Sequence, residues 1–352
     1  MRRVQAPLTD DRRDLSVWMK NAFAELNWVG REAMPVTVLK PHLSSAPSYL
    51  TSLRSGWIDY AAHERSGQPF QAGLIRALGG VLQWMGLDRL VLVGNFPVST
   101  NERTPEQLAD IPQVCRLLER AYPQHFIGVR NILPNRHAEL FSALLAMGYY
   151  AIPSRVVYEF DWRDPLQKLP SHLQRDLSRL KKSSLKAIWR PNLTPLELSR
   201  MELLYRRLYL EKHSFLNPQY TQKFFEDAVS ILGMRCLCLM DANDQILAFS
   251  LVSQTNNRVT VPALGYDTDA KDQGLYRHLF AGLYQALSPS ACWLNYSSGA
   301  GDFKRKRGGQ PALEYTLVRA PSEAGWGARA MVKAMALAGS RVTARQLIAW
   351  GA

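Results

Sequence analysis

The sequence predicts an α/β (α+β) fold built from two layered domains, and three observations support this class. The chain has 352 residues, which is long for a single hydrophobic core. Short apolar strand patterns alternate with helical patterns along its whole length, as in layered folds and unlike bundles or sandwiches. Hydrophobic residues make up 47% and charged residues 21%, the ordinary balance of a globular protein. We therefore expect sheets that are flanked by helices.

The first half shows alternating patterns up to a boundary that we place near residue 162. A helix is expected over "DLSVWMKNAFAEL", where Leu15, Met19, Phe23 and Leu26 repeat at helical spacing. The strands expected after it are "PVTVLK", "DRLVLVGNF", "HFIGVRN", "YYAIP" and "RVVYEFDW". The helices expected among them are "GWIDYAAHE", "PFQAGLIRALGGVLQWMGL", "TPEQLADIPQVCRLLERAY" and "NRHAELFSALLAMG".

The second half begins with a charge shift and a basic helix, "LPSHLQRDLSRLKKS", whose leucines Leu173, Leu177 and Leu180 recur at helical spacing. The order expected next is strand "LKAIWR", helices "TPLELSRMELLYRRLYLEKH" and "NPQYTQKFFEDAVSIL", and strands "MRCLCLM", "QILAFSLVSQ" and "RVTVPALGY". The segment "DANDQ" predicts a tight hairpin between the first two of these strands. Helix "DQGLYRHLFAGLYQAL", strand "ACWLNY" and strand "ALEYTLV" follow.

These patterns predict three regions, an N-terminal domain over 1–162, a C-terminal domain over 163–320 and a helical tail over 321–352. The tail is Ala-rich and amphipathic, and we expect it to pack on the body. Its four cations against one acid leave lipid binding open.

The charge distribution indicates the class of binding partner, and the cysteine content indicates the cellular compartment. The net charge is +13, of which residues 1–160 contribute +3 and residues 161–352 contribute +10. Such asymmetry favours a polyanionic partner for the second half, such as RNA, a nucleotide or a membrane surface. The four cysteines show no zinc-ligand spacing, and Cys236 and Cys238 are expected to be buried free thiols. We expect no bound metal, no stable membrane insertion and a cytoplasmic location.

The segment "GAGDFKRKRGGQP" places four cations, Lys304 to Arg307, between glycines. Alone, it is compatible with a nucleic-acid patch, a solvated loop or part of a reaction centre. Its context favours the reaction centre. The stretch "LGYD…GLYRHLFAGLYQAL…WLNYSSGAGDFKRKRGGQP" resembles the C-terminal domain of the Fem-type family, and the order of elements resembles the GNAT acyltransferase fold. Fem-type proteins are tandem-GNAT aminoacyltransferases that move an amino acid from aminoacyl-tRNA to an amine.

The resemblance covers roughly residues 165–320 and implies two GNAT-like domains, each a mixed, mostly antiparallel sheet flanked by helices. It rests on a Phe-Lys pair, Phe303 and Lys304, that follows a strand and a glycine segment and precedes a glycine and a proline. For residues 1–162 it rests on element order alone. It implies aminoacyl-tRNA as co-substrate, an amine of a small-molecule or peptide precursor as acceptor, and no cofactor.

The resemblance also assigns roles to residues. Phe303 anchors the loop and Lys304 stabilises the oxyanion that forms during amine attack, so Lys304→Met is expected to slow transfer without unfolding the protein. Asp267 and Asp302 are the candidates for a proton acceptor or an orienting group, although aspartate also favours turns. Candidates to line the substrate pocket are Tyr266, Asn295, Tyr296, Gly299 and Gly301.

The remaining cations are expected to meet phosphates of the donor's 3′ end, with a solvated loop as the alternative. The expected tRNA-binding residues are Arg305, Lys306, Arg307, Arg175, Arg179, Lys181 and Lys182. Of these, Arg175, Arg179 and Lys182 share one side of the basic helix because of their spacing.

Two alternatives stay open. One is an acyl-CoA-dependent N-acyltransferase, in which the turn "KDQGLY" would hold the pyrophosphate. This turn keeps Gly274 but has Lys271 and Tyr276 at the other two positions of the CoA-binding pattern, which weakens that alternative. The other is a non-catalytic RNA-binding protein on a GNAT scaffold.

Overall fold

The structure, a computed structural model, describes residues 12–40, 47–59, 62, 70, 73, 75, 77, 79, 80, 83, 86–164, 167–270, 273–323 and 326–349. Contacts within the chain divide it into two compact units. Unit 1 comprises residues 1–155, 216–218 and 313–352. Unit 2 comprises residues 156–215 and 219–312.

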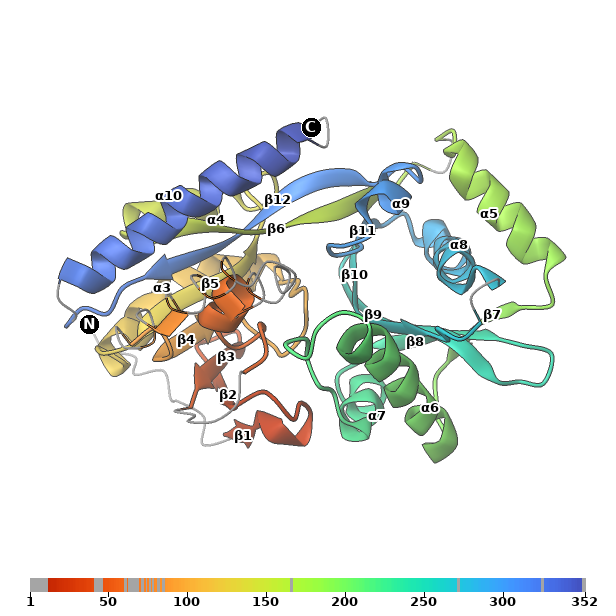
Figure 1. Ribbon diagram of the computed structural model, residues 1–352, viewed down its shortest axis with the longest axis horizontal. Helices are drawn as coiled ribbons and strands as arrows, with labels where there is room; N and C mark the ends of the chain where they lie inside the picture. Colours follow the sequence, from red (N-terminus) through yellow and green to blue (C-terminus); the bar gives the residue numbers. More distant parts are fainter. Residues whose placement is uncertain are drawn as a thin grey trace. The chain divides into compact units, whose positions relative to one another are not determined.

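Unit 1 is a mixed sheet covered by helices (Figure 1). Its strands, in spatial order, are β1 (Arg13–Asp14), β2 (Ala24–Val29), β3 (Met34–Leu39), β4 (Leu90–Val93), β5 (Phe126–Ile132), β12 (Gln310–Arg319) and β6 (Tyr150–Asp161). Its helical elements are η1 (Leu15–Val17), η2 (Ser55–Asp59), α3 (Pro105–Ala121), α4 (Ala138–Ala146) and α10 (Trp326–Ala349). β4 and β5 run parallel, with α3 connecting them, whereas β5 and β12 run antiparallel.

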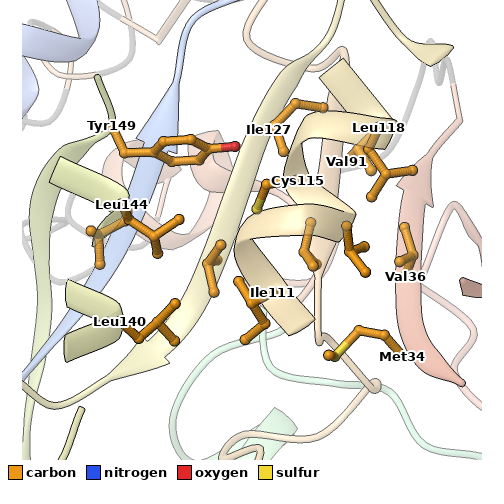
Figure 2. Packing of buried hydrophobic residues seen from close by; sticks show 14 of the residues in the cluster. Met34, Val36, Val91, Ile111, Cys115, Leu118, Ile127, Leu140, Leu144 and Tyr149 are labelled. Atoms are coloured by element: carbon orange, nitrogen blue, oxygen red, sulfur yellow. The ribbon is translucent and has the colours of Figure 1, made fainter. Parts of the chain in front are cut away.

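The core of unit 1 lies where α3 and α4 pack against β3, β4 and β5. Figure 2 shows Ile111, Cys115 and Leu118 of α3 among residues of these strands and of α4. Burial raises the pKa of the Cys115 thiol to about 12, so this cysteine is a neutral packing group. α3 begins with a capping box, in which Thr104 and Gln107 satisfy each other's backbone N–H groups.

The strands of unit 2 also pair in mixed directions and carry helices on both faces. Its strands, in spatial order, are the second half of β6, β11 (Trp293–Asn295), β10 (Arg258–Tyr266), β9 (Ile246–Thr255), β8 (Arg235–Met240) and β7 (Lys186–Arg190). Its helical elements are α5 (Ser171–Lys182), α6 (Pro195–Tyr205), η3 (Arg206–Glu211), α7 (Gln222–Ser230), α8 (Leu275–Leu287), η5 (Ser288–Ser290) and α9 (Gly301–Arg305). α5 and α8 cover one face of the β7–β9 sheet, and α6 and α7 cover the other (Figure 1).

Strands β10 and β11 are parallel but pair only over a short length. Their register covers Arg258 to Thr260 on β10, whereas β10 stays paired with β9 as far as Tyr266. The pairing of β10 with β9 shifts in register between Thr260 and Ala263. Pro262 lies in this stretch, and proline has no backbone N–H to donate to a neighbouring strand. The carboxyl half of β10 is paired with β9 but not with β11. It leads to α8, and the chain then returns to β11.

The predicted fold class is confirmed, because each unit is a mixed, mostly antiparallel sheet flanked by helices. The hairpin at "DANDQ" is confirmed by antiparallel pairing of β8 and β9, and the four cysteines are buried and free. Most of the helix predicted over 69–87 lies outside the described residues.

Three local predictions were wrong. The expected first helix is instead the short turn η1 followed by β2, which pairs with β3. The two strands expected on either side of Ser154 are one strand, β6. The glycine-basic segment, expected as a loop, contains the short helix α9.

Strands β6 and β12 each belong to both units. Residues 150–155 of β6 fall in unit 1 and residues 156–161 in unit 2, and β12 returns to unit 1 at Leu313. The tail helix α10 is also counted with unit 1. The division into regions 1–162, 163–320 and 321–352 stays a prediction.

Candidate active site in unit 2

Lys304 is the centre of the candidate site and is almost completely enclosed. It lies in α9, with 2% of its surface exposed. Its Nζ donates to the backbone oxygens of Tyr296 at 2.6 Å, Ser297 at 3.1 Å and Ser298 at 2.8 Å. An ammonium group has three N–H donors, so these carbonyls match its capacity. Lys304 therefore ties the segment that follows β11 to α9.

Aromatic rings surround this ammonium group. Nζ lies 5.0 Å from the ring centre of Tyr296 and 5.5 Å from that of Tyr158 on β6. Phe303, its neighbour in α9, packs on Tyr276 at 4.6 Å and on Phe280 at 5.7 Å between ring centres. These contacts hold the ring of Phe303 against α8, and its role in the reaction stays a prediction. A cation over aromatic faces in a dry site is electrostatically favoured.

Arg307 is also buried in unit 2, where it pairs with a carboxylate. Its Nε lies 2.6 Å from Oδ2 of Asp176 on α5, and these side chains are 6% and 2% exposed. Its guanidinium stacks on Phe303 at 3.5 Å, and Nη1 donates to the Phe303 carbonyl. Arg277 of α8 approaches the other oxygen of Asp176 at 3.6 Å. Asp176 of α5 therefore contacts α8 and the turn that follows α9.

The other members of the cation run have different surroundings. Lys306 is exposed and pairs with Asp302 at 2.8 Å, one helical turn away. Hydrogen bonding by Lys306 lowers the pKa of the Asp302 carboxyl. Arg305 donates to the hydroxyl of Tyr158 at 3.2 Å. The four consecutive cations thus occupy four unlike environments, and their proposed contacts with tRNA stay a prediction.

The predicted pocket-lining residues lie on the segments around Lys304. Asn295 is buried and its Oδ1 accepts the N–H of Ser297, while Tyr296 is buried beneath Lys304. Gly299 is exposed at φ +77°, a conformation that favours glycine. A Cβ on Gly301 would overlap the hydroxyl of Tyr158. The ring of Tyr266 lies 5.9 Å from that of Tyr276. Their contact with a substrate stays a prediction.

Asp267 follows β10 and is held by arginines. Its Oδ2 accepts from Nη2 of Arg200 at 2.7 Å, and its Oδ1 lies 3.8 Å from Nη1 of Arg207 and accepts the N–H of Asp269. Burial opposes ionisation, but the hydrogen bonds and the two arginines outweigh it and lower the pKa of this carboxyl. A carboxylate with a lowered pKa is a weak proton acceptor, so these contacts favour an orienting role over a general base.

The lowered pKa of Asp267 predicts a pH effect on stability. A carboxyl with a lower pKa in the folded than in the unfolded state stabilises the fold above the unfolded value, and this contribution disappears as pH falls below about 4. In urea unfolding, Asp267→Asn should be less stable than wild type at pH 6, and the difference should shrink at pH 3. An equal difference at both pH values would contradict the assigned ionisation.

A basic pocket opens at the N-terminus of α8. It measures about 380 Å³ and is lined by Arg179, Lys182, Ser183, Gln273, Gly274, Arg277 and His278. Gly274 caps α8 at φ +59° without a side-chain cap. Burial and then Arg277 lower the pKa of His278, so its ring is neutral at pH 7. Three cations and an uncapped helix N-terminus make this pocket suited to phosphate groups.

The binding of tRNA by the predicted basic side of α5 stays a prediction. Arg175, Arg179, Lys181 and Lys182 are all exposed on α5, and Arg179 and Lys182 reach the pocket. Pattern reasoning missed Asp176 and Tyr158. A signal for Asp176 existed, because it shares the apolar face of α5 with Leu173 and Leu180. Tyr158 had no such signal, since it precedes the expected boundary.

The described residues show neither a metal cluster nor a membrane span. No three His, Cys, Asp or Glu side chains among them gather as metal ligands would. No described helix, α10 included, carries an apolar stretch of the length and hydropathy needed to cross a bilayer.

Comparisons with known proteins identify the fold. No family model matches the chain, and no curated protein matches it either. Among solved structures, the C-terminal domain of a protein assigned as a lysylphosphatidylglycerol synthetase from Agrobacterium fabrum is 16% identical, with a TM-score of 0.51 over 70% of this chain and 81% of that one. L-PGS from Bacillus licheniformis is 13% identical, with a TM-score of 0.50 over 69% and 80%. FemX is 8% identical, with a TM-score of 0.51 over 86% and 89%. At these identities the likeness shows that the chain shares the fold of FemX and of the two synthetase structures.

Proposed function

Proceeding from this shared fold, we propose that the protein is a transferase that passes an aminoacyl group from aminoacyl-tRNA to the amine of a small molecule or peptide precursor. The observation that carries the proposal is the basic pocket at the N-terminus of α8, the helix that joins the parallel strands β10 and β11. The carboxyl ends of parallel strands are a recurrent place for ligands. A phosphate-bearing donor fits the charge of this pocket.

The chemistry requires positioning more than covalent participation. The amine nitrogen attacks the ester carbonyl carbon, a C–N bond forms, the C–O bond to the ribose breaks, and the ribose oxygen receives the proton that the amine loses. Negative charge develops on the carbonyl oxygen. The buried ammonium of Lys304 would favour that charge, either directly or through the segment that it holds. Direct donation requires Lys304 to release one of its three carbonyls.

Two features favour tRNA over coenzyme A as the donor. Arg175 and Lys181 add exposed positive charge on α5 beside the pocket-lining Arg179 and Lys182, which suits a polyanion longer than one pyrophosphate. Tyr276 packs its ring on Phe303 and lies 6.1 Å from the Tyr296 ring, so it fills space near the turn where a CoA site favours a small residue. An acyl-CoA donor is the second candidate because the same pocket would accept a pyrophosphate.

A donor assay tests the proposal. The full chain is incubated with a mixture of amino acids and amino sugars and either radiolabelled aminoacyl-tRNA or radiolabelled acetyl-CoA, each with and without RNase. We expect labelled amide only from aminoacyl-tRNA, and RNase should abolish it. Turnover of acetyl-CoA alone would establish the second candidate. Strongly salt-dependent RNA binding without amide formation from either donor would indicate the non-catalytic RNA-binding protein.

The pocket cations give a further prediction. Arg179→Gln combined with Lys182→Gln should raise KM for the donor roughly tenfold and leave kcat nearly unchanged, because these contacts serve ground state and transition state alike. The slope of log affinity against log salt should fall by roughly 1.5 to 2. The control is Arg206→Gln with Lys212→Gln, two exposed cations outside the pocket. Equal effects of both pairs would show that total charge matters and the pocket does not.

A further inference from the structure

Arg103 lies at the carboxyl ends of the parallel strands β4 and β5 in unit 1, on the segment that leads into α3. Its Nη2 donates to the carbonyl of Gly94 at 2.9 Å and to that of Arg130 at 2.8 Å. These residues directly follow the paired stretches of the two strands. The side chain is 5% exposed. Arg103 thus occupies the type of position at which open sheets bind ligands.

Most of the donor capacity of Arg103 is unused. A guanidinium has five N–H bonds, and Nη2 supplies both of its own to the two carbonyls. Nε and Nη1 are enclosed and have no hydrogen-bond partner among the described residues. Leaving buried charged donors unsatisfied is costly. Burial lowers the pKa of Arg103 to about 10 although the carboxylate of Glu102 acts in the opposite direction, and Arg103 therefore stays charged at pH 7.

Three charged side chains act on Arg103 electrostatically, because Glu102 and Glu314 attract its guanidinium and Arg130 repels it. The guanidinium of Arg130 is 7% exposed, and its Nη1 donates to Oδ1 of Asn95 at 2.8 Å and to the carbonyl of Leu50. Glu314, the buried carboxylate of unit 1 among the described residues, is held by Arg155, whose Nε lies at 2.8 Å and Nη2 at 3.3 Å from its two oxygens. The negative charge of Glu314 is thus already engaged.

The backbone next to Arg103 makes room for the guanidinium. Gly94 has φ +62°, and a Cβ at this position would overlap Nε of Arg103. The N-terminus of α3 is already satisfied by its capping box of Thr104 and Gln107. Nε and Nη1 of Arg103 are buried side-chain donors that the described residues leave unpaired.

We propose that unit 1 binds an oxyanion, a carboxylate or phosphate group of a small molecule, against the guanidinium of Arg103. Such a group would accept from Nε and Nη1, the donors that have no partner among the described residues. The site lies in a different unit from Lys304 and does not depend on the transfer reaction.

Thermal unfolding of the full chain tests the site. The melting midpoint is measured against increasing sodium phosphate and, separately, sodium succinate, each compared with sodium chloride at equal ionic strength. We expect a saturable rise with at least one oxyanion and none with chloride, because a ligand that binds only the folded state stabilises it. The two arms show whether phosphate or carboxylate is preferred. A midpoint that depends on ionic strength alone would overturn the proposal.

Two further measurements show where in the protein the oxyanion binds. Arg103→Lys should bind the oxyanion roughly tenfold to a hundredfold more weakly, whereas Arg116→Lys, an exposed arginine on α3, should bind like wild type. If Arg103→Lys does not fold, hydrogen–deuterium exchange of wild type decides. The oxyanion should protect amides in 94–104 and 126–133. Protection confined to 273–278, at the basic pocket of unit 2, would overturn the assignment.

Discussion

Replacing Lys304 with methionine is expected to lower the transfer rate by roughly 10²–10³ and also to destabilise the fold by about 3 kcal/mol or more. Methionine has a similar length but no donor, so the carbonyls of Tyr296, Ser297 and Ser298 lose their charged partner. The sequence led us to expect a slower variant that stays folded, and the structure adds an expected loss of stability. The measurements are urea unfolding and the single-turnover rate under conditions where the variant is folded.

The control for this variant is Lys306→Met, two residues away. Lys306 is exposed and its partner Asp302 is exposed, so its loss should cost less than about 1 kcal/mol. The split between kinetic constants separates the two roles of Lys304. A drop in kcat with unchanged KM indicates direct stabilisation of the oxyanion, whereas a rise in KM as well indicates action through the segment it holds. Wild-type stability of Lys304→Met would show that its three hydrogen bonds contribute nothing net, and a near-normal rate would remove Lys304 from the reaction.

Replacing Asp176 with alanine is expected to cost about 3–5 kcal/mol of folding free energy. The substitution leaves the buried guanidinium of Arg307 without its carboxylate, 2.6 Å away in wild type. It also releases the link between α5 and the turn that follows α9. The free energy of unfolding from urea titration measures the loss.

A double variant tests whether the cause is the unpaired charge. Asp176→Leu combined with Arg307→Met removes both charges and keeps apolar volume, so it should be more stable than Asp176→Ala alone. If Asp176→Ala costs under 1 kcal/mol, or if the double variant is no more stable than the single one, the buried pair is not what holds the turn after α9 against α5.

Regular elements with local signals were predictable from the sequence, and elements defined by distant partners were not. α3 carries its own start signal in Thr104 and Gln107, and the hairpin between β8 and β9 carries its turn in "DANDQ". The first predicted helix failed because Leu15 and Leu26 are buried in a short turn and in a strand that pairs with β3. Pairing with a remote strand overrode the local spacing.

The candidate site was predictable in its residue types but not in its contacts. A run of four cations is normally solvated, because lysine and arginine are seldom buried without partners. The backbone carbonyls that enclose Lys304 and the aspartate that holds Arg307 leave no trace in the run itself. α9 is too short to show a period. The pocket at α8 combines two helices that are about 90 residues apart in sequence, so its charge is visible only after folding.

The late position of β12 in the chain has a consequence for folding during synthesis on the ribosome. β5 pairs on one side with β12, whose residue Leu317 lies opposite Val129. At typical elongation rates, β12 leaves the ribosome roughly 10–40 s after β5. During that interval one edge of β5 is a template for unwanted strand pairing in the nascent chain. Dependence on chaperones should therefore be greatest in this interval, and truncated chains that end before β12 should aggregate.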